Sequence, residues 1–325
     1  MGLSFGIRFD LRNPAIAATS MADRYGAAVD MAEWADHLGC VNVTLSEHHG
    51  SSDGYLPSPL AMVAAMATRT RTTRFMIAAL IAPLHDPLRL AEDLLFLDNL
   101  TRGRIDVVLA GGYVREEFAM FDVPMNERGQ RVTEAVHTLR SAFRGEAFDF
   151  RGRSVHLTPA PFSARGPAVL LGGSSEAAAR RAARIADGFI PSLPEFWEFY
   201  RDETVKLGRP DPGPTQQRDN TTVFLADDPE EAWPRMAPYF LHEMNAYGAW
   251  QAQDDVATQY RTTSSVDELR ASGQYRIITP AQMVDELRAM PFPFHMFHPM
   301  CGGMPVDLAW SSLALFEKRV LPEFA

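Results

Sequence analysis

Cysteine is nearly absent from this chain, and basic residues are fewer than acidic ones. The 325 residues include two cysteines, Cys40 and Cys301. Two thiols are too few for a disulfide framework or for a zinc site built on several cysteines. The 31 Lys and Arg residues against 41 Asp and Glu residues give a formal net charge of −10. Because non-specific nucleic-acid binding needs a basic surface, we expect no DNA or RNA partner.

Long apolar runs are also missing. No segment reaches the roughly 20 uncharged apolar residues of a membrane span. The first residues lack the basic-then-apolar order of a signal peptide, since Arg8 and Asp10 follow the start almost at once. We therefore expect no membrane association and a cytoplasmic location. With 46% hydrophobic residues and no internal repeat, the chain predicts one globular domain over residues 1–325, that of an enzyme.

Eight short apolar runs alternate with helical patterns along the chain. They are Leu3–Phe9, Val41–Leu45, Phe75–Ala82, Ile105–Ala110, Val169–Leu171, Gly188–Pro191, Thr221–Ala226 and Phe294–Phe297. Because helices separate most of these runs, they predict a parallel sheet covered by helices. The number of strands, and the lack of a G-x-G-x-x-G turn after any of them, favour an α/β fold of the (β/α)8 TIM-barrel type over an open doubly wound sheet.

Two segments are longer than a barrel requires. Residues 113–167 contain a predicted helix, Glu127–Phe143, and a predicted hairpin around Phe148–Leu157. Residues 246–275 are polar and predict a long loop near the barrel mouth. Long ordered loops of this kind usually serve binding.

Glu47-His48-His49 follows the second strand, where barrel enzymes place their chemistry. A neutral imidazole can hydrogen-bond a ligand and move a proton near pH 7. Strand side chains alternate between faces, so at most one of the two histidines faces the barrel axis unless the strand has ended. A packing role for the histidine remains an alternative. We expect no metal site, because no His-x-His or Cys-x-x-Cys follows any of these strands.

Small residues end two other strands. Gly172-Gly173-Ser174-Ser175 precedes a helix, and its backbone N–H groups could bind a phosphate at the positive end of the helix dipole. Ala110-Gly111-Gly112-Tyr113 would leave a flat floor on which a planar ring could lie. Taken alone, the first segment is better explained as an ordinary strand–turn–helix with a serine cap, and the second is equally a plain turn.

Together, several segments resemble the bacterial luciferase-like flavin monooxygenases. They are Ser46-Glu47-His48-His49, residues 82–93, residues 97–104 (LDNLTRGR), residues 116–118, residues 182–189, and the closing residues 302–305 and 320–322. The resemblance implies a TIM barrel with insertions that binds reduced FMN, or its deazaflavin analogue, at the carboxyl ends of the strands. It also implies a homodimer.

The resemblance assigns roles by position. His48 matches the active-site histidine beside the flavin, and Glu117 matches an acidic residue near it, so both are candidate catalytic residues. Ala78-Ala79 matches a non-prolyl cis peptide behind the flavin ring. Gly173, Ser174 and Ala177 match the phosphate cradle. The candidate cofactor-binding residues are thus Ala78, Ala79, Ala110, Gly111, Gly112, Gly172, Gly173, Ser174 and Ala177.

The chain departs from bacterial luciferase itself at the end of the fourth strand. Ala110 and Gly111 stand where luciferase has a reactive cysteine and a phosphate-binding arginine, so we expect no light emission. The phosphate is then left to backbone amides and to Arg115. Deazaflavin-using relatives often share a Gly-Gly-Tyr ending here, but the proton-donating glutamate that some carry near Gly112 is absent.

The resemblance implies a monooxygenase that acts on a small organic substrate through a flavin 4a-hydroperoxide. Because the chain has no nicotinamide-binding fingerprint, a separate flavin reductase would supply the reduced FMN. His48 would hydrogen-bond the flavin–oxygen adduct or carry its proton. Two alternatives stay open: a deazaflavin-dependent oxidoreductase that transfers hydride, and a flavin-binding protein without catalysis. A metal-dependent hydrolase is a more distant alternative.

Overall fold

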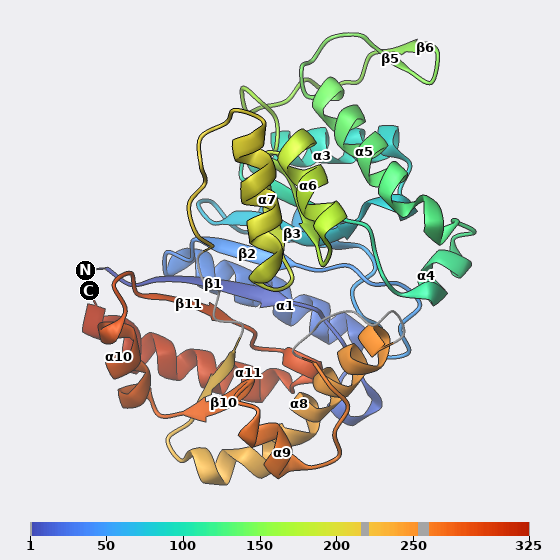
Figure 1. Cartoon of the computed structure of the whole chain (residues 1–325). Coiled ribbons are helices and arrows are strands. Elements are labelled where there is room, and N and C mark those ends of the chain that lie inside the picture. The colour runs from blue at the N-terminus through green and yellow to red at the C-terminus, as the bar shows by residue number, and fades with distance from the viewer. Residues whose placement is uncertain (1, 216–220, 253–259, 325) are drawn as a thin grey trace.

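The computed structural model describes residues 2–215, 221–252 and 260–324. All eight predicted strands are present, and seven of them form one curled parallel sheet in the order β11-β1-β2-β3-β4-β7-β8 (Figure 1). Their bounds are β1 (Ser4–Phe9), β2 (Asn42–Leu45), β3 (Arg74–Ile81), β4 (Ile105–Ala110), β7 (Val169–Gly173), β8 (Gly188–Pro191) and β11 (Phe294–Phe297). The prediction of a parallel α/β sheet is confirmed.

The remaining strand does not close this sheet into a hydrogen-bonded barrel within the described residues. β9 (Thr222–Leu225) pairs in parallel with β10 (Tyr275–Ile278), a strand that the sequence analysis did not predict. The Leu225 N–H donates to the Ser312 hydroxyl at 2.8 Å instead of to a neighbouring strand. β9 still contacts β11, so the two sheets meet through side chains. Within the described residues, the sheet is therefore not closed into a barrel of eight hydrogen-bonded strands.

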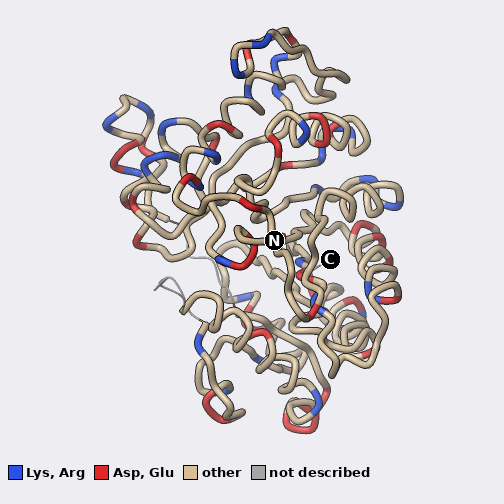
Figure 2. The backbone as a smooth tube through the Cα atoms, turned by 90° about the vertical axis from the view of Figure 1, so that its right-hand side faces the viewer, with Lys and Arg blue, Asp and Glu red and all other residues tan. Residues whose placement is uncertain are grey.

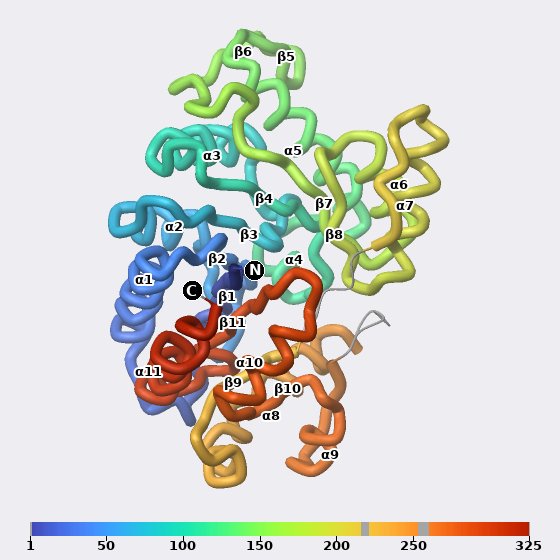
Figure 3. The backbone as a smooth tube through the Cα atoms, turned by 90° about the vertical axis from the view of Figure 1, so that its left-hand side faces the viewer, coloured from blue at the N-terminus to red at the C-terminus, as the bar shows by residue number. Residues whose placement is uncertain are grey.

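Helices cover the outside of the curled sheet. Figure 3 shows α1 (Met21–His37), α2 (Pro59–Ala67) and α3 (Pro87–Thr101) in a row outside the first strands. Ser20 and Asp86 begin the first and third of these helices, and each side chain accepts hydrogen bonds from the first-turn N–H groups. The remaining helices of this layer include α6 (Glu176–Ile185), α7 (Glu195–Lys206), α10 (Pro280–Ala289) and α11 (Val306–Leu315).

The first predicted insertion is confirmed, and the second is only partly a loop. Residues 113–167 form α4 (Arg115–Met120), α5 (Arg128–Ala142) and the antiparallel hairpin of β5 (Phe148–Phe150) and β6 (Arg153–Val155). In the second insertion, α8 (Pro229–Ala252) continues past residue 246, and α9 (Val266–Ala271) follows. The loop prediction was wrong for these helical residues, because α8 packs its buried stripe against β9 and β10. Residues 253–259 of the predicted loop lie outside the described residues.

Two apolar clusters hold these layers together. The larger one joins the seven-stranded sheet to its helices, and the smaller one joins α8, β9 and β10 around Phe240 and Tyr275. On the surface, Lys and Arg residues alternate with Asp and Glu residues along the chain (Figure 2). Ion pairs such as Arg184 with Glu203 link neighbouring helices there. Among the described residues, no helix is long and apolar enough to cross a membrane.

Candidate active site

The carboxyl ends of β2, β3, β4 and β7 lie next to one another because these strands are parallel neighbours in the sheet. The segments that follow them therefore meet at one edge. These segments include residues 46–49, 110–113 and 172–175, which the sequence analysis selected. The fold thus brings the predicted catalytic and cofactor-binding segments to a common place.

His48 and Glu117 form a buried pair at this edge. Glu117, on α4, is 1% exposed, and His48 is 7% exposed. Glu117 Oε1 lies 2.8 Å from His48 Nδ1 and accepts the His49 backbone N–H at 2.8 Å. Since a carboxylate can only accept, we assign the imidazole proton to Nδ1, which leaves Nε2 with its lone pair. The Tyr113 hydroxyl lies 3.4 Å from that Nε2.

Aromatic rings surround the His48 imidazole. Ring centroids lie 4.8 Å away for Tyr55, 5.6 Å for Tyr113 and 4.5 Å for Trp250. Tyr247 follows at 6.3 Å, and its hydroxyl bonds that of Tyr55 at 2.9 Å. Tyr247 and Trp250 come from α8, which reaches over the edge of the sheet. These rings keep water away from the histidine.

Glu47 and His49 belong to a separate network on the other side of the strand end. Glu47 accepts from the Ile81 N–H at 2.5 Å, from His85 Nε2 at 2.8 Å and from His49 Nε2 at 3.1 Å. Burial alone would raise the pKa of Glu47, but the hydrogen bonds from His49, His85 and Ile81 outweigh it and lower that pKa to about 2. Of the two adjacent histidines, His48 is therefore the one that faces Glu117 and the aromatic rings.

The Ala78–Ala79 peptide bond is cis, as the resemblance implied. It lies near the end of β3, where the register with β4 shifts between Ala78 and Leu80. The Ser46 hydroxyl donates a hydrogen bond of 2.9 Å to the Ala78 carbonyl. This bond ties the cis peptide to the segment that carries His48.

The predicted phosphate cradle lies where β7 turns into α6. Gly172 and Gly173 end the strand, Ser174 follows, and Ala177 lies in the first helical turn. The helix cap is Ser175, whose hydroxyl accepts the Ala178 N–H at 3.3 Å. A Cβ on Gly173 would lie 2.5 Å from the Ala178 Cβ, so only glycine allows this tight turn. The Ser174 side chain is thus left free of the capping role.

The end of β4 carries the other two glycines. Gly112 has φ +72°, and a Cβ there would lie 2.8 Å from Ile81 Cγ2. Beside Gly111, the aliphatic carbons of Arg128 come within 3.8 Å of where a Cβ would stand. Arg128 begins α5 and Arg115 begins α4, and both residues are exposed. The sequence analysis considered Arg115 and missed Arg128, because the distance between Gly111 and α5 depends on how the insertion folds.

A buried arginine was also missed. The Arg12 guanidinium is 0% exposed and lies 4.6 to 4.7 Å from the ring centroids of Tyr55, Tyr247 and Trp250. Its charge is balanced by Asp53, whose Oδ2 is 2.5 Å from Arg12 Nη1. Arg12 therefore holds together the aromatic rings that enclose His48. Nothing in its sequence surroundings distinguishes it from a surface arginine.

Comparison with known families gives a match over most of the chain. A family described as luciferase-like monooxygenase matches residues 4–290. An uncharacterized protein of Sinorhizobium fredii, y4wF, is 32% identical over 163 residues, which cover 50% of this chain and 47% of that protein. The chain thus spans less than half the length of this curated relative.

Two relatives with assigned activities are more distant. Limonene 1,2-monooxygenase of Rhodococcus erythropolis is 23% identical, covering 91% of this chain and 80% of that protein. The oxygenase component of the flavin-dependent trigonelline monooxygenase of Acinetobacter baylyi is 25% identical, covering 38% of this chain and 34% of that protein.

Solved structures share the fold. Monooxygenase RslO1 from Streptomyces bottropensis has a TM-score of 0.76 at 24% identity, covering 99% of this chain and 100% of that one. The oxygenating constituent of 3,6-diketocamphane monooxygenase from Pseudomonas putida, in complex with FMN, has a TM-score of 0.72 at 18% identity, covering 100% and 99%. An F420-dependent secondary alcohol dehydrogenase has a TM-score of 0.67 at 13% identity, covering 100% and 99%.

The Glu47 network predicts a pH-dependent stability. Folding lowers the pKa of the Glu47 carboxyl from 4.5 to about 2. The stabilisation that this carboxylate gives the folded state is therefore complete above pH 4.5 and is lost as the pH falls toward 2. We expect Glu47→Gln to lower the free energy of unfolding by up to about 3 kcal/mol at pH 7. In urea unfolding experiments, the difference in free energy of unfolding between the wild type and Glu47→Gln should become smaller as the pH falls from 7 to 3. Glu323→Gln, which removes an exposed ion pair with Arg288, is the control. A gap that stays constant over this range would contradict the assignment.

Proposed function

The chain belongs to the family of luciferase-like monooxygenases, and from this premise we propose that it oxidises a small organic substrate with reduced FMN and O₂. The observation that carries the proposal is the buried His48–Glu117 pair at an edge where β7 ends in two glycines and two glycines follow the neighbouring β4. The assigned relatives support the reaction class, since their names describe monooxygenases and one is flavin-dependent. The chain is thus an enzyme of the flavin-dependent oxidoreductase class.

The residues at this edge fit a flavin. A flat ring needs small neighbours, and Ala78, Ala79, Ala110, Gly111 and Gly112 provide them. We propose that the backbone of Gly172 and Gly173, together with Ser174 and Ala177 at the start of α6, binds the phosphate. Arg128 lies beside Gly111 and would supply the positive charge that luciferase places on the fourth strand. Reduced flavin, when bound here, supplies the electrons that activate O₂.

His48 is positioned to hold or move a proton at Nε2. Glu117 acts through His48, because its Oε1 keeps the proton on Nδ1 and fixes the direction of the ring. Glu117 Oε2 is buried and makes no hydrogen bond among the described residues. The enclosing rings of Tyr55, Tyr113 and Trp250 exclude water from the reacting atoms.

The remaining expectations complete the proposal. Residues 1–325 form a single barrel domain, in which β9 lies against β11. The enzyme functions as a homodimer. A separate flavin reductase supplies reduced FMN, as the name "oxygenase component" indicates for the trigonelline enzyme. No light emission is expected, because Ala110 and Gly111 replace the luciferase residues.

A deazaflavin-dependent hydride transfer is the second candidate. It is favoured by the Gly111-Gly112-Tyr113 ending of β4, and the F420-dependent dehydrogenase shares the fold. Anaerobic titration of the purified chain with reduced FMN and, in parallel, with the reduced deazaflavin separates the two. Tight binding of reduced FMN, followed by reoxidation on mixing with O₂, supports the monooxygenase. Binding of the deazaflavin alone would refute the monooxygenase and favour hydride transfer. Binding of neither cofactor would refute both functions.

The phosphate assignment predicts a selective loss of affinity. Arg128→Ala should weaken binding of reduced FMN by about 10- to 100-fold, the usual value of one charged hydrogen bond. Reduced riboflavin, which lacks the phosphate, should bind the variant as it binds the wild type. Arg115→Ala is the matched control and should change neither affinity. An equal loss for both flavins would show that Arg128 supports the fold and not the phosphate.

The role of His48 predicts a separation of binding from turnover. His48→Ala should change the affinity for reduced FMN by less than about tenfold, or roughly 1.4 kcal/mol. Product formation from a panel of small organic substrates, with a flavin reductase present, should fall by at least about 100-fold, because the variant lacks the Nε2 atom that would accept and carry a proton. His37→Ala, at an exposed position of α1, should behave as the wild type. Equal turnover in the His48 variant would refute the assignment.

A further inference from the structure

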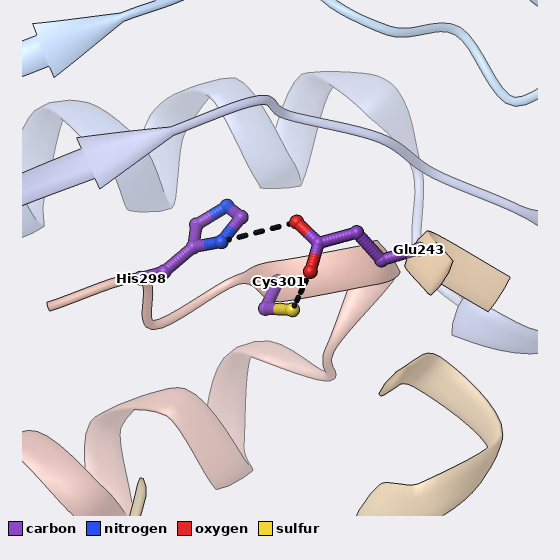
Figure 4. A group of neighbouring side chains, drawn as sticks. All are labelled: Glu243, His298 and Cys301. Atoms are coloured by element: carbon purple, nitrogen blue, oxygen red, sulfur yellow. Dashed lines mark hydrogen bonds and ion pairs between the residues drawn. The ribbon is translucent and has the colours of Figure 1, made fainter. Parts of the chain in front are cut away.

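A second group of polar side chains lies where α8 meets the segment that follows β11 (Figure 4). Glu243 comes from α8, His298 follows the strand, and Cys301 begins the 3-10 turn η4 (Cys301–Gly303). One carboxylate oxygen, one ring nitrogen and the sulfur lie within 4.8 Å of one another. The two segments are in tight contact, since a Cβ on Gly302 would lie 2.0 Å from the Tyr239 backbone carbonyl oxygen.

The group is fully buried, and its hydrogen bonding is incomplete. Glu243 and Cys301 are 0% exposed and His298 is 3% exposed. Both donors to Glu243, the Tyr275 hydroxyl at 2.7 Å and the Cys301 thiol at 2.9 Å, bond to the same oxygen, Oε2. Glu243 Oε1 and both ring nitrogens of His298 make no hydrogen bond among the described residues. Although the buried Arg8 guanidinium also attracts Glu243, the free carboxylate oxygen and the unpaired ring nitrogens leave lone pairs that could bind a further partner.

The unsatisfied atoms point at each other. His298 Nδ1 lies 3.3 Å from Glu243 Oε1, as Figure 4 shows. On the other side of the ring, His298 Nε2 lies 3.5 Å from Asp10 Oδ1. A carboxylate behind a histidine, with the opposite nitrogen directed at further donors, is the arrangement that orients histidine ligands in metal sites.

We propose that Glu243, His298 and Cys301 bind a divalent metal ion, and that this ion is Zn²⁺. A carboxylate oxygen, an imidazole nitrogen and a thiolate sulfur together are the ligand set of zinc, whereas Mg²⁺ and Ca²⁺ take oxygen ligands. On binding, the Cys301 thiol releases its proton to solvent and the sulfur–zinc bond replaces its hydrogen bond to Glu243. Asp10 Oδ1 accepts a hydrogen bond from the protonated Nε2 of His298 and so fixes the orientation of the ring. The sequence analysis expected no metal because no His-x-His or Cys-x-x-Cys follows a predicted strand, and these three residues form neither motif.

The metal site connects to the active site through α8. Glu243, Tyr247 and Trp250 are spaced by four and three residues, so they lie on one face of the helix. Tyr247 and Trp250 are the rings that enclose Arg12 and His48. A zinc ion would attach this face to the end of β11 and keep the two rings in place. The occupancy of this site does not depend on the flavin proposal.

The test is metal binding by the full chain without cofactor. Protein is treated with a chelator, dialysed, and titrated with Co²⁺, which reports thiolate ligation by a charge-transfer absorption; bound Zn²⁺ is then counted by elemental analysis. We expect one ion per chain, a thiolate–cobalt band, and a rise in the midpoint of thermal unfolding. Cys301→Ser and His298→Asn should weaken Co²⁺ binding by at least about 100-fold and abolish the band, since even loss of an outer partner costs 10- to 100-fold.

Cys40→Ser is the matched control, because Cys40 is the other buried thiol and lies outside this group. It should bind Co²⁺ as the wild type does. A wild-type chain that gives no thiolate–cobalt band overturns the proposal without reference to any variant. A band that persists in Cys301→Ser and disappears in Cys40→Ser also overturns it.

Discussion

The hydrogen bond between the Glu117 carboxylate and His48 Nδ1 is the interaction on which the active site depends. It joins α4, an element of the first insertion, to the loop after β2, which are 69 residues apart in the chain. The same carboxylate oxygen accepts the His49 N–H, so the backbone of this loop and the ring of His48 are fixed together. With the proton held on Nδ1, the Nε2 lone pair is directed toward the Tyr113 hydroxyl, which follows β4.

The two adjacent histidines have different partners and different roles: His49 bonds to Glu47 and supports the strand end, whereas His48 bonds to Glu117 in the candidate active site. Glu47 is saturated by His49, His85 and a backbone N–H, which explains why its pKa is held at about 2 and why it supports the strand end. Glu117 keeps one oxygen without a hydrogen bond among the described residues, and His48 keeps one nitrogen for a ligand. Buried polar groups that are only partly satisfied mark places where a substrate or cofactor completes the network.

Much of this arrangement could be predicted from the sequence. Strand periodicity is a local signal, so the eight strands listed from the sequence were predicted correctly. His48 and Glu117, as separate candidate residues, and the cis bond at Ala78–Ala79 came from the resemblance to a known family, whereas the direct contact of the two side chains was not predicted. The pairing of β10 with β9 and the length of α8 were missed, because tertiary packing decides them.

The missed site residues have the same cause. Arg128 reaches Gly111 only because the insertion folds back over β4, and Arg12 meets three aromatic rings from two distant segments. Glu243, His298 and Cys301 come together across α8 and η4 with no spacing rule to reveal them. Contacts between segments far apart in the chain leave no periodic pattern in the sequence.

The most direct test of this account is the protonation of the His48 ring in the resting enzyme, measured by ¹⁵N NMR in slightly alkaline buffer with a His48→Asn sample to assign the signals. The account predicts a proton on Nδ1, bonded to Glu117, and an unprotonated Nε2. A proton on Nε2 with an unprotonated Nδ1 would contradict it, because Glu117 would then not position the histidine.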